Sequence, residues 1–409
     1  MARQRIIAVG AALMALAGCA GSAASDGSGG PTASGGSRSS MATTSMSVSG
    51  PWRAWTATLT RQEAHGGCGA TAHQVVCATD SGGFVGRSRA DGRITWTVPS
   101  DGHGKSAGLV VDAAAERAVT GVAGVLRAAN LRTGAQAWTH RSATGSIYAA
   151  LGAADGVVYA VGATDPTSST AVLDAVRASD GAPLWHRTVA WSTGEPLAAF
   201  GGRVYTGDGT RRVTARDART GATVATSPAS VECQHLVTGG HYLVCTGSPF
   251  SAGDIFPPMR RLDPATLRPL PTPRNTIDKP VRGVISEDGV LVLYEAGAED
   301  TSAGNWFAYD LKNDRKLWST YATEADAAVA DGRFVTFTPV NDQTNRGRVL
   351  TIDLHAGPQG TGTAAPRMAP PYAQTRDGEH PTLIAPGGDA GHVVVMARTH
   401  GSLRSLPLP

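Results

Sequence analysis

Residues 156–185 read GVVYAVGATDPTSSTAVLDAVRASDGAPLW, and this stretch holds the unit from which most of the chain is built. An apolar run follows Gly156, a second apolar run follows a polar segment, and an Asp-Gly turn then leads to Trp185. Short apolar runs bounded by Gly, Asp and Pro are typical of antiparallel strands, whereas a helical repeat would show a period of about 3.6 residues. The stretch therefore predicts short strands that are joined by tight turns.

The turn and the tryptophan recur along the chain. In four copies a tryptophan lies four residues after the central turn residue, at Trp96, Trp138, Trp185 and Trp318. Asp314 replaces the turn glycine in one copy, and aspartate tolerates the left-handed backbone that such a turn needs. The repeat length is about 44 residues, in the range of propeller blades, with turn residues at 92, 134, 181, 221, 267, 314 and 357. Four strands of about five residues with their turns fill this length.

The pattern Gly-x-Val-Tyr followed by Asp-x-x-Thr-Gly-x-x-x-Trp resembles the repeat of PQQ-like β-propellers, over about residues 51–408. In that family the repeated tryptophan docks one blade on its neighbour, which agrees with the packing expected of a large aromatic side chain at a fixed repeat position. Ala225 and Pro271 stand where two copies would carry tryptophan, so we expect irregular packing around the fourth and fifth blades. The resemblance is specific for the fold and permissive for function.

The two ends of the chain decide the number of blades. The last three predicted strands, at 382–384, 392–396 and 402–406, have no fourth strand, while residues 52–59 form an orphan strand of the tryptophan type. Pairing that first strand with the last three completes an eighth blade and removes the exposed sheet edges. We therefore predict an all-β propeller of eight four-stranded blades. Seven blades is the alternative if one weak unit is not a blade.

The first 50 residues predict export and a lipid anchor. Residues 1–18 begin with basic residues and contain an apolar segment that has the length of a signal peptide and is too short to span a membrane. They end in Leu-Ala-Gly before Cys19, which resembles the lipobox of bacterial lipoproteins and implies that Cys19 carries a lipid. The alternative is an ordinary signal peptide that is cleaved nearby. Residues 19–50 predict a flexible Gly/Ser-rich tether, so residues 51–409 would fold outside the cytoplasm, anchored to the cell membrane.

The remaining four cysteines form two close pairs, Cys68 with Cys77 and Cys233 with Cys245. A two-residue hairpin at 72–73 would place the first pair directly opposite each other, and a three-residue loop would do so for the second. Opposed cysteines on neighbouring strands are close enough to bond, and exported proteins fold in oxidising surroundings. We therefore predict two disulfides.

A zinc site is the alternative for these cysteines, because two histidines accompany each pair, namely His65 and His73 or His235 and His241. In a hairpin the four side chains would have to converge from both faces of the strands. This requirement favours the disulfides.

The sequence offers little for catalysis. Quinoprotein dehydrogenases, which share the repeat, hold their quinone against two adjacent cysteines, and no two cysteines are adjacent in this chain. The haem-attachment, nucleophile-elbow, His-Glu-x-x-His and phosphate-loop motifs are also missing from the sequence. The 36 basic and 33 acidic residues form no basic cluster, which disfavours a nucleic-acid partner. We therefore expect no catalytic residues, no cofactor and no metal.

The candidate binding face consists of the loops that join the last strand of one blade to the first strand of the next, at the mouth of the central channel. In the register of the repeat these loops contain His103, Lys105, Trp191, Glu195, Asp278, Glu324, Asp326, Arg376 and His380. Trp191 lies outside that register, and an aromatic residue in a loop can anchor a partner. The alternative, which we favour, is that Trp191 covers the end of the channel or packs on the strand of Trp185.

Three functions are compatible with these features. We favour a membrane-tethered extracytoplasmic scaffold that binds a protein or another envelope ligand and is not an enzyme. The second is an extracellular enzyme, either a quinoprotein-type oxidoreductase or a hydrolase or lyase, with its site at the channel mouth; this function requires a bound quinone or metal, or converging carboxylates. The third is a ligand-sensing propeller that reports to a membrane partner.

Overall fold

The computed structural model describes residues 52–409 except 101–103, 166–167, 192–196, 209, 247–257, 275–279, 297–302, 324–325, 339–345, 374–381, 387–390 and 398–400. The signal peptide (1–18), Cys19 and the tether (19–50) lie outside the described residues, so they remain predictions. None of the helices in the described part of the chain is long and apolar enough to cross a membrane.

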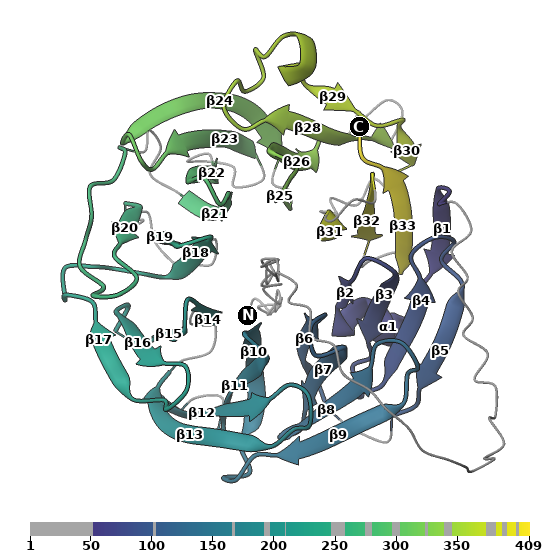
Figure 1. The fold of residues 1–409 in the computed structure, drawn as a ribbon, viewed down its shortest axis with the longest axis vertical. Helices are drawn as coiled ribbons and strands as arrows, with labels where there is room; N and C mark the ends of the chain where they lie inside the picture. The colour runs from purple at the N-terminus through teal and green to yellow at the C-terminus, as the bar shows by residue number, and fades with distance from the viewer. Residues whose placement is uncertain are drawn as a thin grey trace, which may run out of the picture.

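The strands form a ring of eight antiparallel blades, with the first strand of each blade nearest the central axis (Figure 1). Blade 1 contains β2 (Cys68–Ala70), β3 (Gln74–Ala78), β4 (Phe84–Ser88) and β5 (Ile94–Val98). Blade 2 contains β6 (Ser106–Asp112), β7 (Arg117–Val122), β8 (Val125–Asn130) and β9 (Gln136–Arg141). Blade 3 contains β10 (Ile147–Ala154), β11 (Val157–Ala163), β12 (Thr170–Arg177) and β13 (Pro183–Ala190). Blade 4 contains β14 (Leu197–Phe200), β15 (Arg203–Gly207), β16 (Val213–Asp217) and β17 (Thr223–Thr226).

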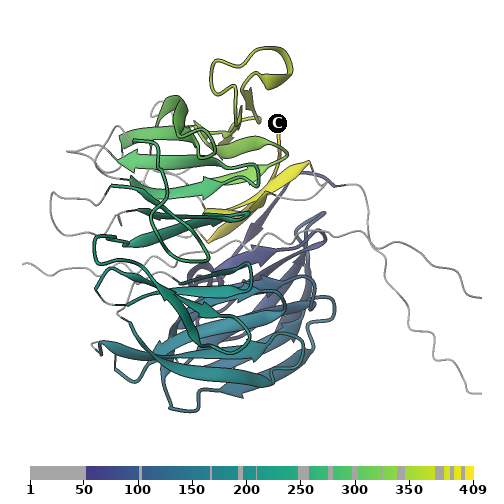
Figure 2. The same cartoon turned by 60° about the vertical axis from the view of Figure 1, so that its left-hand side comes forward.

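The second half of the ring is less regular. Blade 5 contains three strands among the described residues, β18 (His235–Gly239), β19 (Tyr242–Thr246) and β20 (Arg260–Leu262). Blade 6 contains β21 (Pro280–Ile285), β22 (Val290–Ala296), β23 (Ala303–Asp310) and β24 (Arg315–Thr323). Blade 7 contains β25 (Ala328–Ala330), β26 (Arg333–Phe337), β28 (Val349–Asp353) and β29 (Arg367–Met368). Beside it, β27 (Arg346–Gly347) pairs with β30 (Tyr372–Ala373), and a loop carrying the 3₁₀-helix η1 (Gly362–Ala364) projects outward (Figures 1 and 2).

The N-terminal strand closes the ring, as the sequence predicts. Blade 8 contains β31 (Thr382–Pro386), β32 (His392–Ala397), β33 (Ser402–Pro407) and, on its outer edge, β1 (Trp55–Thr58). Trp55 lies opposite Ser405 in this pairing. Just before β1, the Trp52 ring stacks on the His392 ring, with 4.7 Å between the ring centroids. The Trp52 indole N–H donates to Ser405 Oγ at 2.8 Å. The prediction of an eight-bladed propeller that is closed by its first strand is thus confirmed.

A short helix, α1 (Arg61–Gly66), follows β1 and was not predicted from the sequence. Thr60 caps it by accepting a hydrogen bond from the Glu63 N–H, and the Glu63 carboxylate accepts one from the Thr60 N–H. This reciprocal capping box stabilises the first turn of a helix. The other Glu63 oxygen lies 2.9 Å from Arg87 in a buried ion pair, so α1 is attached to the middle of blade 1.

Tryptophans join neighbouring blades in the repeat register. The indole N–H of Trp96 donates to Leu131 O at 3.0 Å, that of Trp138 to Ala178 O at 2.9 Å, that of Trp185 to Ala218 O at 2.9 Å and that of Trp318 to Leu354 O at 2.8 Å. Trp55 on β1 makes the equivalent bond to Arg89 O at 2.9 Å. Each accepting carbonyl belongs to the turn before the last strand of the next blade.

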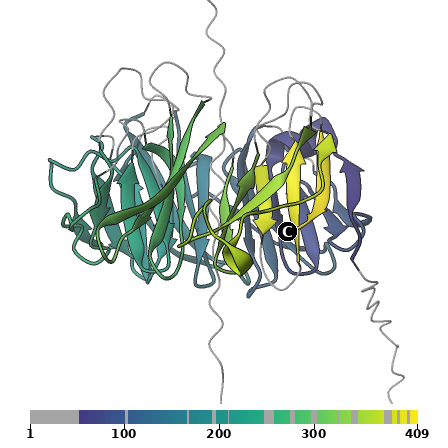
Figure 3. The same cartoon turned by 90° about the horizontal axis from the view of Figure 1, so that it is seen from above.

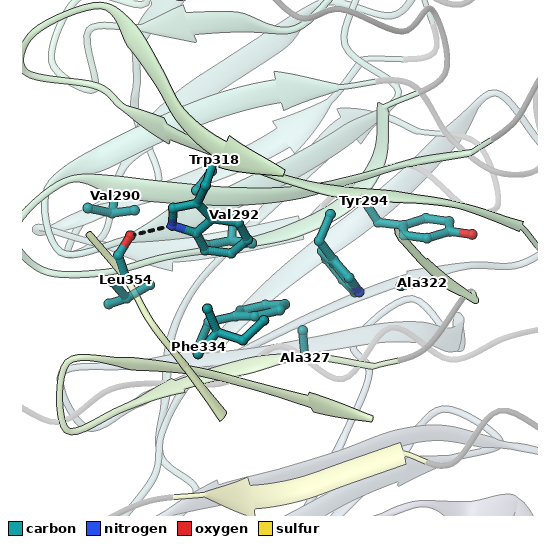
Figure 4. Packing of buried hydrophobic residues seen from close by; sticks show 11 residues of the cluster. Val290, Val292, Tyr294, Trp318, Ala322, Ala327, Phe334 and Leu354 are labelled. Carbon is teal, nitrogen blue, oxygen red and sulfur yellow. Dashed lines mark hydrogen bonds between the residues drawn. The ribbon is translucent and has the colours of Figure 1, made fainter. Parts of the chain in front are cut away.

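The turn glycine is required because the indole lies directly on it. A Cβ atom at Gly134 would lie 2.6 Å from the Trp96 ring, and a Cβ at Gly181 would lie as close to Trp138. Both glycines also have a positive φ, which disfavours a side chain. Figure 4 shows the cluster between blades 6 and 7, where Trp318 and Phe334 pack together and the indole reaches Leu354 O.

Three of the eight junctions lack a repeat tryptophan, and the two at the fourth and fifth blades are packed differently, as expected. Between blades 4 and 5, Ala225 replaces tryptophan and the buried Leu267 replaces the turn glycine, with φ of 56°. Leu267 and Ala225 belong to the same apolar cluster, and the Tyr205 hydroxyl donates to the turn carbonyl of Pro264 at 3.1 Å. Between blades 5 and 6, Arg261 donates to Leu311 O at 2.5 Å.

Both predicted disulfides are confirmed, but one predicted register is wrong. Cys68 lies directly opposite Cys77, as expected, and the two are bonded. Cys233 is bonded to Cys245, although Cys245 lies opposite Leu236. The hairpin turns at residues 240–241 rather than through a three-residue loop, because Gly240 adopts the left-handed conformation. Cys233 therefore precedes β18 and reaches Cys245 from outside the paired strands.

Candidate binding face

The loops that leave the outermost strand of one blade and enter the innermost strand of the next lie at one end of the ring. This follows from the antiparallel order of strands in each blade, which gives all innermost strands the same direction. The tryptophan-docking turns lie at the opposite end. Figure 3 shows the ring edge-on, with the strands running between these two ends.

Only three of the nine side chains predicted for this face belong to the described residues: Lys105, Trp191 and Asp326. The other six lie outside them: His103, Glu195, Asp278, Glu324, Arg376 and His380. Lys105 is exposed immediately before β6, where a cation is accessible to a partner. The structure does not bring these three residues into one site.

Trp191 is a core residue rather than a surface anchor. Its side chain is 3% exposed and belongs to the same cluster as Trp185, Val189 and Leu197. Its backbone N–H donates to Ser169 O at 3.0 Å, which extends the pairing beyond β13. The packing alternative therefore holds, and Trp191 must be removed from the candidate binding residues.

Asp326 joins two blades instead of facing solvent freely. Its Oδ1 atom accepts from the Ala327 N–H at 3.0 Å, and its Oδ2 atom accepts from the Leu383 N–H on β31 of blade 8, also at 3.0 Å. The Asp326 carbonyl oxygen in turn accepts from the Thr336 hydroxyl at 3.0 Å. Because a carboxylate receives the N–H of a neighbouring inner strand, Asp326 positions blades 7 and 8 at the channel.

A buried polar group between blades 2 and 3 was missed in the sequence. The Tyr148 hydroxyl donates to Asp174 Oδ2 at 2.7 Å, and both side chains are about 3% exposed. Burial, with the hydrogen bond to Asp174, raises the pKa of the Tyr148 hydroxyl far above its usual value. Burial also lowers the pKa of His140, while the charge of Asp174 opposes that shift. The signal was an aspartate in the middle of an otherwise apolar strand, TAVLDAVR.

Blade 6 repeats this arrangement, and its junction with blade 5 holds a histidine. The Tyr309 hydroxyl donates to the fully buried Glu295 at 2.5 Å. Burial, helped by the charge of Arg282, lowers the pKa of His235 to about 4, so its ring is neutral at neutral pH. Glu295 also lies within an apolar strand, VLVLYEA, which is the signal that the sequence offered.

The zinc alternative fails on the geometry of the cysteines. All four are bonded as disulfides, so none can supply a thiolate ligand. His65 instead lies 3.1 Å from Asp80. Within the described residues, no three His, Cys, Asp or Glu side chains lie close enough together to hold a metal ion.

The residues do not fit the quinone that the repeat family suggests. Quinoprotein dehydrogenases with this repeat hold the quinone against two adjacent cysteines. Here the disulfides link residues 9 and 12 positions apart, within blade 1 and within blade 5. Cys77 of the first disulfide and its neighbours Val75 and Val76 are fully buried, so this part of blade 1 is packed core. We therefore derive no chemistry through a quinone.

Solved structures share the fold at low sequence identity. The crystal structure of BamB from Moraxella catarrhalis has 17% identity and a TM-score of 0.56, with 86% of this chain and 98% of that chain covered. The computationally designed Ika8 protein has 14% identity and a TM-score of 0.61, with coverages of 86% and 98%. A quinohemoprotein alcohol dehydrogenase from Pseudomonas putida HK5 has 12% identity and a TM-score of 0.55, with coverages of 87% and 76%. At identities this low, the similarity to these structures shows the fold alone.

No protein of curated function matches the sequence. The family described as outer membrane protein assembly factor BamB matches residues 52–190 and 169–404. The two overlapping matches span nearly the whole propeller, from the orphan strand to the last strand. The chain therefore belongs to the family of PQQ-like β-propellers that is described as outer membrane protein assembly factor BamB.

Proposed function

We propose that this chain is an exported scaffold that is tethered to a membrane by a lipid on Cys19 and holds a protein of the cell envelope. The family match over residues 52–404 carries the proposal, because that family is described as an assembly factor for outer membrane proteins. The chain acts as a platform and catalyses no reaction. The ligand-sensing role is set aside because no feature of the described residues favours it.

The build of the ring supports a rigid platform. Indole-to-carbonyl bonds of 2.8–3.0 Å join blades at five junctions, and the N-terminal strand closes the circle. The closed ring leaves each blade only a short outer edge, so the loops and these outer edges are the places where a partner can bind. Loops on a fixed scaffold are the usual place for recognition.

The buried carboxylates support a structural rather than a catalytic role. Glu63 pairs with Arg87, Asp174 with Tyr148 and Glu295 with Tyr309, and these three pairs lie in different blades. Two carboxyl groups that act together as acid and base would have to face one reacting atom. Each of these groups instead satisfies a polar side chain inside the ring.

The test is crosslinking and affinity capture of the full-length protein from its native membrane, with Cys19→Ala as the matched variant. Incorporation of an alkyne-labelled fatty acid into the parent but not into the variant establishes the anchor. A protein partner that is recovered with the parent and lost with the variant supports the scaffold. Recovery of the protein alone, or stoichiometric quinone or metal in the purified protein, overturns it.

A further inference from the structure

Residues 268–274 read RPLPTPR and occupy the outer position of blade 5, where other blades have a fourth strand. They contact β20 through one isolated bridge, between Leu262 and Pro269. The Leu270 N–H also donates to Arg261 O at 2.9 Å, and the Arg261 N–H donates to Thr272 Oγ1 at 2.9 Å. The segment is therefore attached to the blade without forming a regular strand.

The three prolines of the segment decide what can bind to it. Proline fixes φ near −65° and has no N–H, so the outer edge of blade 5 cannot accept a further β-strand from a partner. Alternating prolines instead favour the polyproline II conformation, which has three residues per turn. Addition of a partner strand at this edge is thereby disfavoured.

The segment lies against the blade mainly through its second half, where Leu270 and Thr272 are half-buried and Pro273 is buried. The exposed residues are Arg268, Pro269, Pro271 and Arg274. In a three-fold helix, residues 268, 271 and 274 would share one side. The solvent-exposed part of the segment thus has an arginine at each end and two prolines between them.

We propose that residues 268–274 are a docking segment for a protein domain with an aromatic-lined groove that is flanked by carboxylates. Aromatic grooves bind proline rings of a preformed polyproline II segment at low entropic cost. Guanidinium groups stack on aromatic rings and pair with carboxylates, so two flanking arginines select an acidic groove. The inference rests on the proposed scaffold function and names the kind of partner.

The test uses the full-length protein with a photo-crosslinking residue in place of Ala265, which is exposed in the turn beside the segment. The control places it at Arg219, the exposed third residue of the equivalent turn in blade 4. We expect a protein adduct from position 265 that a synthetic peptide of residues 267–275 suppresses. A peptide in which alanine replaces the three prolines should require an about tenfold higher concentration to suppress the adduct equally.

Variants of the intact protein complete the test. Arg268→Glu with Arg274→Glu should reduce the adduct at least about tenfold, because like charges then face the groove, and Pro271→Ala should reduce it less. Arg219→Glu should leave it unchanged. Unaltered thermal melting of each variant excludes misfolding, and the peptide competition does not depend on the variants.

The outcomes separate this inference from the scaffold function. A partner that is captured through a crosslinker at Lys105 but is indifferent to the peptide and to the variants overturns the docking segment and leaves the scaffold standing. A non-protein adduct at 265 also overturns the docking segment. If no protein is captured through a crosslinker at position 265 or at Lys105, both proposals are overturned.

Discussion

The junction between blades 4 and 5 contains a compensated exchange that can be tested by reversing it. At five junctions a tryptophan packs on a turn glycine, whereas here Ala225 faces the buried Leu267. The side chain removed from one partner is thus replaced by a side chain on the other. If this is correct, the substitutions Ala225→Trp and Leu267→Gly should be strongly coupled.

The magnitudes follow from burial and backbone strain. Leu267→Gly removes a fully buried leucine side chain, which costs about 3–5 kcal/mol, and relieves a left-handed φ of 56°, which returns about 1 kcal/mol. A net loss of about 2–4 kcal/mol is therefore expected. Ala225→Trp alone meets an occupied space and should cost about 1–3 kcal/mol. Together they restore the repeat, with a coupling free energy of about 2 kcal/mol or more.

Urea unfolding monitored by circular dichroism, with calorimetry to check for intermediates, measures this coupling. The matched control is the regular junction of Trp185 and Gly221, where a Cβ would lie 2.6 Å from the indole ring. Gly221→Leu should be severely destabilising there, and Trp185→Ala should partly rescue it. Additive losses in the double variant of Ala225 and Leu267 would refute the idea that Leu267 fills the tryptophan position.

Three further predictions concern the disulfides and the buried polar groups. Cys68→Ser with Cys77→Ser should lower the free energy of unfolding by about 2–3 kcal/mol, and the difference from the parent should vanish when both are melted in reductant. Tyr148→Phe should cost about 1–3 kcal/mol, since it leaves the buried Asp174 without its hydroxyl donor, and equal unfolding midpoints in urea would contradict this. The pKa of His235 is lowered to about 4 in the folded state, below the value of about 6.5 in an unfolded chain, so stability should be lost as the pH falls from about 6.5 through 4. His235→Gln should flatten the profile of unfolding midpoint against pH in that window.

The fold was predictable because the same sequence pattern occurs several times along the chain. The four-residue spacing from the central turn residue to tryptophan recurs at four turns, and each copy corresponds to an indole that docks on the next blade. The closing strand was predictable as well, since Trp55 makes the same bond as the other tryptophans. Repetition turned a weak local signal into a specific prediction.

Features that occur once were harder to predict. The capping box of α1 was readable as Thr-Arg-Gln-Glu at 60–63, but no period drew attention to it. The register of the second hairpin depended on which glycine of the pair at 239–240 turned left-handed. To predict the pair of Asp174 and Tyr148, one would need to know which side chains of different strands lie on the same face of the blade. The candidate binding face was the hardest feature to predict. Loop residues such as Asp326 follow no repeated pattern, so the sequence does not distinguish residues that contact a partner from residues that join two blades.

Two consecutive junctions that depart from the repeat adjoin blade 5, and these departures bear on function. The turn glycine is replaced by Leu267 before that blade's outer segment, Pro271 stands at the next tryptophan position, and hydrogen bonds from Tyr205 and Arg261 substitute for the missing indoles. A tryptophan position that is left unfilled creates a cavity and lowers the free energy of unfolding by several kcal/mol. A junction that had only lost its tryptophan would not contain such replacement contacts. Here the blade is stabilised by other contacts while its outer edge is released from the strand pattern. An edge that lacks a regular fourth strand can carry the sequence RPLPTPR, so this edge of blade 5 is where a partner specific to this chain should bind.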